Sequence, residues 1–312
     1  MRAVAGQKQA DKNVSVFKRI KAFMADSSFT AAKKVNRGTA GNILTLAILL
    51  LVAAFMAMPF LYTVMQALKP MNELFIFPPR FFVKNPTLDN FYMLTQQLNN
   101  LWVPFTRYLF NSVFVTAVTT VLQIFACSMG AYVLSKGSIK YKNAIFSVIV
   151  LTLLFAGDTT AIPRYVIMSY AKIIDTYLAI ILPAIAAPLG LFLMKQYIQD
   201  GIPDSIIESA KIDGAGSFKI YRSIVMPMCR PVWMTMIIFC FQSVWSQEGL
   251  EFIYSEPIKM LPTLFRQISA GGIARAGVSA AAAFIIIVPP ITVFIIAQSK
   301  VMETMAHSGV KG

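Results

Sequence analysis

Side chains able to do chemistry are few in this sequence and widely separated. The single histidine, His307, has no cluster of serine, cysteine or carboxylate residues around it from which a hydrolytic site could form. The three cysteines, Cys127, Cys229 and Cys240, lack the spacing of a metal site, and we expect neither a disulfide nor a bound metal. The sequence also contains no G-x-x-x-x-G-K-[ST] loop that would bind the phosphates of ATP. Catalysis by this chain is therefore not expected.

The composition excludes a water-soluble surface for most of the chain. Hydrophobic residues make up 57% of the 312 residues, and charged residues only 13%. This leaves too few charges to cover a soluble protein of this size. The sequence therefore predicts that the lipid bilayer is the main solvent.

Six apolar runs are long enough to cross the hydrocarbon core as α-helices, which takes roughly 20 residues. They are residues 43–68, 108–134, 143–163, 177–194, 231–247 and 276–299. Asp158, near the far end of the third run, is the only carboxylate in these runs. It either caps a broken helix at the membrane interface or binds a substrate or an ion. The predicted fold is an all-α integral membrane protein with six transmembrane helices.

An even number of spans places both termini on one side of the membrane, and the basic residues indicate which side. In this topology the side with the termini carries 19 Lys and Arg against 9 on the other side. Asp and Glu divide equally between the two sides. The positive-inside rule therefore predicts that both termini are cytoplasmic. The basic excess is explained as a topology signal, without nucleic-acid binding.

A polar, basic segment precedes the first span. Apolar Val14, Phe17, Ile20 and Met24 recur in it at helix-like spacing, which would suit a helix lying on the inner leaflet. A disordered basic tail is the alternative. The predicted parts of the chain are a cytoplasmic segment over residues 1–42, a six-helix membrane domain over 43–305 and a cytoplasmic tail over 306–312.

The one long loop on the cytoplasmic side, residues 195–230, has the pattern of two short helices joined by a glycine turn. Pro203 suits the first turn of a helix, and the apolar and charged residues after it interleave as in an amphipathic helix. Gly214 can adopt the positive φ that a helix C-cap or tight turn requires. Ser217 is a good N-cap for a second helix, and Pro227 marks the return to the membrane. A rigid projection of this kind could transmit force to the spans.

The spacing in this loop resembles the EAA motif of binding-protein-dependent ABC importer permeases, EAA-x3-G-x9-I-x-LP. Five of the seven defined positions match, and Ser209 and Met226 replace an alanine and a leucine. In that family the loop docks into a groove on a separate ATPase subunit. The resemblance assigns this contact to Glu208, Ser209, Ala210, Asp213, Gly214, Ile224 and Pro227. An ordinary cytosolic loop, in which Gly and Pro only change the chain direction, is the alternative.

Weaker similarities extend to the carbohydrate branch of the family. The ending VKG at residues 310–312 is similar to that of many carbohydrate permeases, and residues 69–79 resemble their first external loop. The sequence WSQ at 245–247 stands where maltose-type permeases usually have WND. This departure argues against a close relation to maltose permeases.

The resemblance implies the type I ABC importer permease fold and a role as one permease subunit of an ATP-driven importer for a sugar or oligosaccharide. The implied partners are a second homologous permease, an extracytoplasmic solute-binding protein and two ATPase subunits, which would carry ATP and Mg²⁺. This chain would hold no cofactor and no metal. Its location would be the bacterial cytoplasmic membrane.

The resemblance also indicates where a substrate would pass. In the family the path runs between the two permease subunits along the third to fifth spans, which makes Gln242, Trp245, Gln247, Glu248 and Asp158 candidates. An aromatic face can stack on a sugar ring while amides and carboxylates bind hydroxyls. Aromatic residues at helical spacing more often pack in a core, however.

A stand-alone secondary transporter or channel for a small polar solute is the alternative function. Such proteins tend to show inverted repeats and carboxylates within their spans. The sequence shows no evident repeat, and Asp158 is the only carboxylate of that kind. A membrane-embedded enzyme would need the clustered His, Asp or Cys that are absent from the sequence.

Overall fold

The computed structural model describes residues 39–155, 157–272 and 275–308. Most of the predicted N-terminal segment and the end of the predicted C-terminal tail lie outside these residues. All regular elements within them are helical. The chain divides into two units, Met1–Pro59 and Phe60–Gly312, which we describe in turn.

The described part of the first unit belongs to one long helix, α2 (Thr39–Leu68), whose last turns belong to the second unit. Residues 41–68 of α2 are long and apolar enough to cross a membrane. The large side chains from Leu44 to Leu61 are mostly exposed, as expected for a helix surrounded by lipid. The first predicted span is therefore confirmed.

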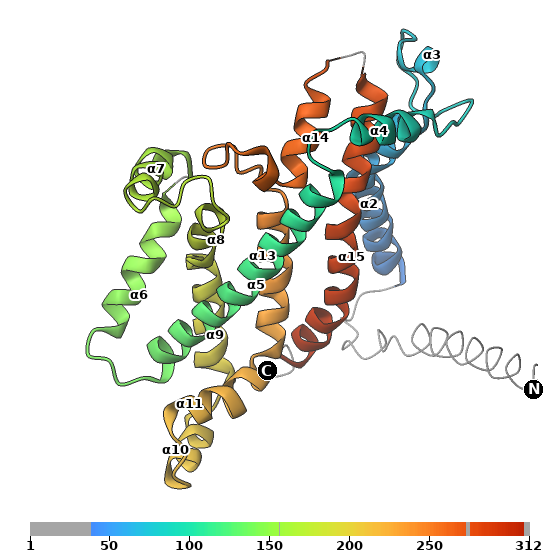
Figure 1. Cartoon of the computed structure of the whole chain (residues 1–312). Helices are drawn as coiled ribbons and strands as arrows, with labels where there is room; N and C mark the ends of the chain where they lie inside the picture. Colours follow the sequence, from blue (N-terminus) through green and yellow to red (C-terminus); the bar gives the residue numbers. More distant parts are fainter. Residues whose placement is uncertain (1–38, 156, 273–274, 309–312) are drawn as a thin grey trace, which may run out of the picture. The chain divides into compact units, whose positions relative to one another are not determined.

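The second unit contains all the other described helices (Figure 1). Those on the N-terminal side of the candidate loop are α3 (Met71–Leu74), α4 (Asp89–Asn99), α5 (Phe105–Lys136), α6 (Lys142–Leu151), η1 (Thr152–Leu154), η2 (Gly157–Thr160), α7 (Ala161–Tyr170), α8 (Leu178–Ile185) and α9 (Pro188–Gly201). Those of the loop and the C-terminal part are α10 (Asp204–Ile212), α11 (Ser217–Ile220), η3 (Tyr221–Val225), α12 (Met226–Met228), α13 (Arg230–Trp245), η4 (Glu256–Ile258), α14 (Leu261–Ser269) and α15 (Ala276–Ser308).

Four helical stretches of the described chain are long and apolar enough to span a membrane, and a bent helix pair would make a fifth. Three of the four are α2, α5 and α15, which contain the first, second and sixth predicted spans. The fourth is the stretch Leu178–Gly201, formed by α8 and α9. The predicted number of six full-length spans is thus not reached among the described residues, because the third and fifth runs form shorter or bent helices.

The third predicted span, residues 143–163, is interrupted in the structure. The apolar helix of this region ends at Leu154, and a short 3₁₀ turn, Gly157–Thr160, separates it from α7. Glycine is entropically costly in a helix, while aspartate and threonine favour caps and turns, so the sequence GDTT breaks the run. This break agrees with the first of the two interpretations of Asp158, a broken helix, although the N-cap of α7 is Thr160 rather than Asp158.

The fourth predicted span also differs from a single straight helix. It is divided between α8 and α9, and Pro188 occupies the first turn of α9, where a missing N–H costs little. The helix then continues to Gly201, seven residues beyond the predicted end at 194. The prediction ended the span at the polar residues Lys195 and Gln196, but these residues are good helix formers and α9 continues through them.

Two buried clusters hold the second unit together at its two ends. One joins α5, α9 and α13 to the loop helices around Met194, Tyr221 and Met236. The other joins α4, α14 and α15 to the first turns of α5 around Tyr108 and Phe265. Figure 1 shows α10 and α11 at one end of this unit and α4, α14 and α7 at the other. The loop over residues 195–230 therefore rests on the packed ends of α5, α9 and α13.

Candidate functional site

The first helix of the candidate loop is α10, which has one buried face and one open face. Ile207 and Ala210 are buried, whereas Glu208 and Ser209 are exposed. This division follows helical spacing and confirms that the helix is amphipathic. Pro203 is the N-cap rather than the first helical residue, one position from the prediction.

A glycine turn ends α10 at the predicted place. Gly214 has φ +77°, a conformation that residues with a Cβ rarely adopt. The N–H of Ala215 donates to the carbonyl of Ala210 at 3.0 Å, and the N–H of Gly214 donates to that of Lys211 at 3.0 Å. These two bonds define a Schellman motif, which satisfies carbonyls at the helix end. The turn is therefore specified by its own hydrogen bonds.

The second half of the loop consists of α11, η3 and α12 in direct succession. Ser217 is the first residue of α11 and Gly216 is its N-cap, again one position from the prediction. Ile224 is half-buried in the π-helical turn η3, and Pro227 is exposed in α12. The stretch Ser217–Met228 meets α13 at an angle of 76°. The chain therefore turns sharply where it leaves the loop, as Pro227 predicted.

The open side of the loop combines charged and large apolar groups. Glu208, Lys211 and Asp213 are exposed, Ile212 has 87% of its surface exposed and Phe218 has 65%. Apolar side chains that are exposed together with polar neighbours often mark a protein-binding surface. The loop thus carries six of its seven predicted contact residues as exposed or half-buried groups, while Ala210 packs inward.

The predicted substrate-path residues are not gathered into one site. Gln242 is exposed on α13, one turn after the exposed Phe239, so this face of the helix is open. Gln247 is half-buried just after the helix end. Asp158 lies in the 3₁₀ turn η2, and its side chain is outside the described part of the structure.

Trp245 was a candidate for the substrate path, but in the structure its side chain is buried. Its side chain is 2% exposed and its ring stacks on Phe241 at 5.4 Å. Its indole Nε1–H donates to the carbonyl of Ile286 in α15 at 3.1 Å. That carbonyl would normally accept from the residue four positions later, which is Pro290 and has no N–H. Trp245 thus satisfies a carbonyl that a proline leaves free, and it offers no open ring face to a sugar.

Glu248 lies in the segment after α13 and is already paired. Its carboxylate forms an ion pair with Arg266 of α14, and its backbone carbonyl accepts a hydrogen bond from the Thr263 hydroxyl. These contacts fix the chain between α13 and α14. Gln247 and Glu248 thus lie in the segment between α13 and α14, whereas Asp158 lies in η2.

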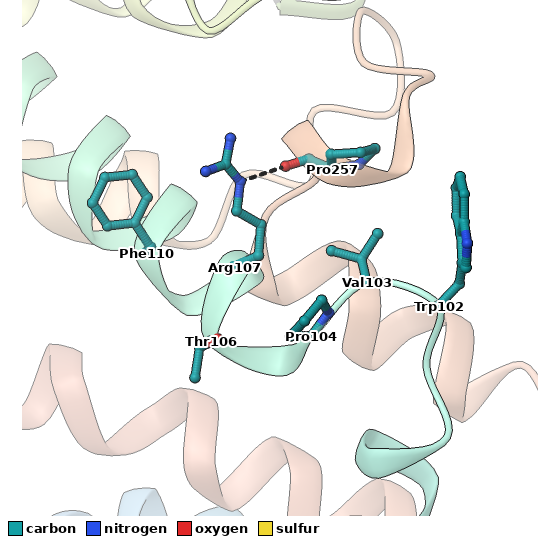
Figure 2. Close-up of a pocket in the computed structure, with 7 residues that line it drawn as sticks. All are labelled: Trp102, Val103, Pro104, Thr106, Arg107, Phe110 and Pro257. Atoms are coloured by element: carbon teal, nitrogen blue, oxygen red, sulfur yellow. Dashed lines mark hydrogen bonds between the residues drawn. The ribbon is translucent and has the colours of Figure 1, made fainter.

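A cavity of about 570 Å³ lies beside the N-terminal end of α5, at the end of the unit away from the loop. Its lining comprises Trp102, Val103, Pro104, Thr106, Arg107, Phe110 and Pro257. Figure 2 shows the Arg107 side chain between Phe110 and Trp102, with its Nε donating to the carbonyl of Pro257 at 3.2 Å. Sequence reasoning missed this site, although an aromatic residue and an arginine just before a span were a visible signal.

Two buried polar side chains that contact the loop were also missed. Lys136 at the end of α5 was counted only as a topology charge, and Ser128 only as part of an apolar run. The structure shows both bonded to loop residues. Within the described residues, no group of three His, Cys, Asp or Glu could hold a metal ion.

Known proteins resemble this chain over most of its length. Protein LplC of Bacillus subtilis (strain 168) is 30% identical over 226 residues, which cover 70% of this chain and 72% of that protein. The arabinooligosaccharides transport system permease protein AraQ of Halalkalibacterium halodurans is 28% identical over 268 residues, covering 83% of this chain and 93% of the relative. A scan against protein-family models finds no match.

A solved structure shares the fold. It is described as a bacterial ABC transporter involved in the import of the acidic polysaccharide alginate. One of its chains superposes with a TM-score of 0.70 at 20% identity, covering 84% of this chain and 98% of that chain. Together with the loop geometry, these relatives confirm the family that the motif indicated: the chain belongs to the ABC importer permeases.

Proposed function

We propose that this chain forms half of the translocation path of an ATP-driven sugar importer and that its loop over residues 195–230 docks on a separate ATPase. The observation that carries the proposal is the helix, glycine turn and helix from Asp204 to Met228. This unit packs on α5, α9 and α13 through one face and leaves Glu208, Asp213 and Phe218 exposed on the other. A rigid body of this kind can transfer movement from a partner to the membrane helices.

A sugar or oligosaccharide is the proposed cargo. Relatives are named as permeases for arabinooligosaccharides and for melibiose, raffinose and stachyose. The exposed face of α13 offers the amide of Gln242 beside Phe239, the kind of pair that can bind a hydroxyl and a sugar face. At the outer end, the cavity at Trp102 and Arg107 is large enough for a saccharide to approach. Gln247, Glu248 and Asp158 remain candidates for the path by position.

The proposed topology places both termini and Gly214 in the cytoplasm of a bacterium. The positive-inside count supports this orientation. The proposed parts remain the cytoplasmic segment over 1–42, the membrane domain over 43–305 and the tail over 306–312. A second permease, two ATPases and an extracytoplasmic solute-binding protein would complete the importer, with ATP and Mg²⁺ held by the ATPases because this sequence has no phosphate-binding loop.

Purification of the full chain from its native membrane tests the proposal. We expect a second permease and an ATPase to copurify, and ATP hydrolysis to be found in the complex but not in the isolated chain. Glu208→Ala should weaken ATPase association, because it removes an exposed charged group from the loop's open face. Glu251→Ala, which alters a glutamate that is also exposed but lies on the opposite side in this topology, is the matched control.

The same experiment separates the proposal from its alternative. A secondary transporter would purify without an ATPase, and its uptake would depend on an ion gradient rather than on ATP. That result would contradict the proposed function. Equal ATPase recovery with Glu208→Ala and Glu251→Ala would instead remove Glu208 from the contact.

A further inference from the structure

Lys136, the last residue of α5, is held by the first residues of the loop. Its Nζ donates to the carboxylate of Asp204 at 2.6 Å and to the carbonyl of Ile202 at 2.8 Å. The Lys136 side chain is only 7% exposed. A buried ammonium is costly unless it is paired and hydrogen-bonded, so these acceptors fix the position of the α10 start relative to α5.

Two features favour the ionised state of Asp204. The hydrogen bond from Lys136 lowers the pKa of the Asp204 carboxyl, and the charge of Lys136 acts in the same direction. Asp204 is itself the first residue of α10, where a negative charge also interacts favourably with the helix dipole. The ionised form of the Asp204 carboxyl is therefore favoured in this contact.

A second polar contact joins α5 to the other half of the loop. The hydroxyls of Ser128 and Tyr221 are 2.7 Å apart in a buried position. The Tyr221 ring also packs against Tyr132, with ring centroids 5.9 Å apart. Ser128, Tyr132 and Lys136 are spaced four residues apart, so one face of α5 contacts both α10 and η3.

The opposite end of α5 is bonded just as specifically. Asn111 donates from Nδ2 to the carbonyls of Pro257 and Lys259, both at 2.9 Å. Tyr108 donates to the carboxylate of Glu256 at 2.8 Å, and Ser112 accepts from the N–H of Leu261 at 2.7 Å. All of these partners belong to the segment that forms η4 and begins α14.

Between these two sets of contacts, α5 is one uninterrupted helix. It has 32 residues and contains no proline. A helix of this length extends about 48 Å, enough to cross the bilayer. We propose that α5 acts as a strut that transmits displacement of the loop to the segment over residues 255–261, with Lys136, Ser128 and Asn111 as its positioning residues. This inference rests on the proposed docking of the loop on an ATPase.

The attachment of the loop can be measured on the full chain without any partner. Spin labels can be attached at Val133→Cys in α5 and Ile212→Cys in α10, because both positions are exposed whereas the native cysteines are buried. We expect the distance between the two labels to have a narrow distribution. The width of this distribution should at least double when Lys136→Met is combined with Tyr221→Phe. Lys140→Met combined with Ser135→Ala is the matched control, because neither side chain bonds to the loop.

The second measurement is coupling in the reconstituted complex. Lys136→Met and Asn111→Leu should each retain the ATPase but lower the uptake per ATP hydrolysed by about tenfold, whereas the control pair should not. An unchanged distance distribution, or an unchanged uptake per ATP in both variants, would overturn the strut. If the unaltered chain recruits no ATPase, the proposed function fails, while the distance measurement still decides whether these residues attach the loop to α5.

Discussion

The turn at Gly214 allows a sharp test of the loop because a neighbouring glycine provides the control. Gly214 has φ +77°, whereas Gly216 has φ −68° and ψ 157°, which any residue can adopt. A Cβ added at either position would meet no atom within 4 Å. Alanine at the two positions therefore differs in backbone strain but not in steric contact within the chain.

The magnitude follows from the backbone conformation. A residue with a Cβ in the left-handed region costs about 1–2 kcal/mol, which changes the equilibrium constant between the native turn and its alternatives by a factor of about 5–30. We expect Gly214→Ala to lower ATPase copurification and uptake by up to a factor in this range, and Gly216→Ala to leave both near the unaltered level. Asparagine tolerates the left-handed region, so Gly214→Asn should be milder than Gly214→Ala.

The assay is uptake measured together with ATPase recovery and the amount of chain inserted in the membrane. Gly214→Asp then reports the effect of a negative charge, because Gly214→Asn has nearly the same shape without it. Equal losses with Gly214→Ala and Gly216→Ala would show that the added side chains disturb a contact surface. The reasoning from backbone strain would then be refuted.

Three further predictions concern packing and charge. Trp245→Phe removes the indole donor and leaves a carbonyl of α15 unsatisfied, which should lower the free energy of unfolding in detergent by about 1–3 kcal/mol. Gly190→Ala places a Cβ 2.6 Å from the terminal methyl of Met236, and because that methyl can move, the cost should be near the lower end of about 1–3 kcal/mol for overpacking; Gly190→Leu should cost more in the same unfolding assay. The hydroxyl and N–H of Ser255 lower the pKa of Asp175, so this link stabilises the fold above the ordinary carboxyl pKa and is lost as the pH falls through the lowered value. The unfolding temperature should therefore fall more steeply below about pH 4 in the unaltered chain than in Asp175→Asn, and parallel curves would contradict this assignment.

Local features of the loop could be predicted from the sequence because each depends on a few adjacent residues. Glycine is the residue type that most readily adopts the φ of +77° found at Gly214. Pro203 and Pro227 restrict the backbone on either side of this turn. The helical nature of the chain and four of its long apolar stretches likewise follow from hydropathy over about 20 residues.

Features that depend on distant parts of the chain could not be predicted in the same way. Trp245 and Ile286 are 41 residues apart in sequence, and Lys136 and Asp204 are 68 residues apart. No local pattern shows that a tryptophan will donate to a particular carbonyl or that a lysine will be buried. The break in the third run could be given only as one of two interpretations of Asp158, because hydropathy averages do not show whether the short polar sequence GDTT ends a helix.

The bond between Trp245 and Ile286 has a consequence for how this family can change over evolution. Position 290 lacks a backbone N–H as long as it is proline, and position 245 supplies the missing donor. A relative that loses the tryptophan keeps the carbonyl at position 286 of α15 bonded only if position 290 regains an N–H or another side chain supplies one. The residues at 245 and 290 should therefore be replaced together among homologues, and a sequence that carries only one of the two replacements should show a second donor near the same turn.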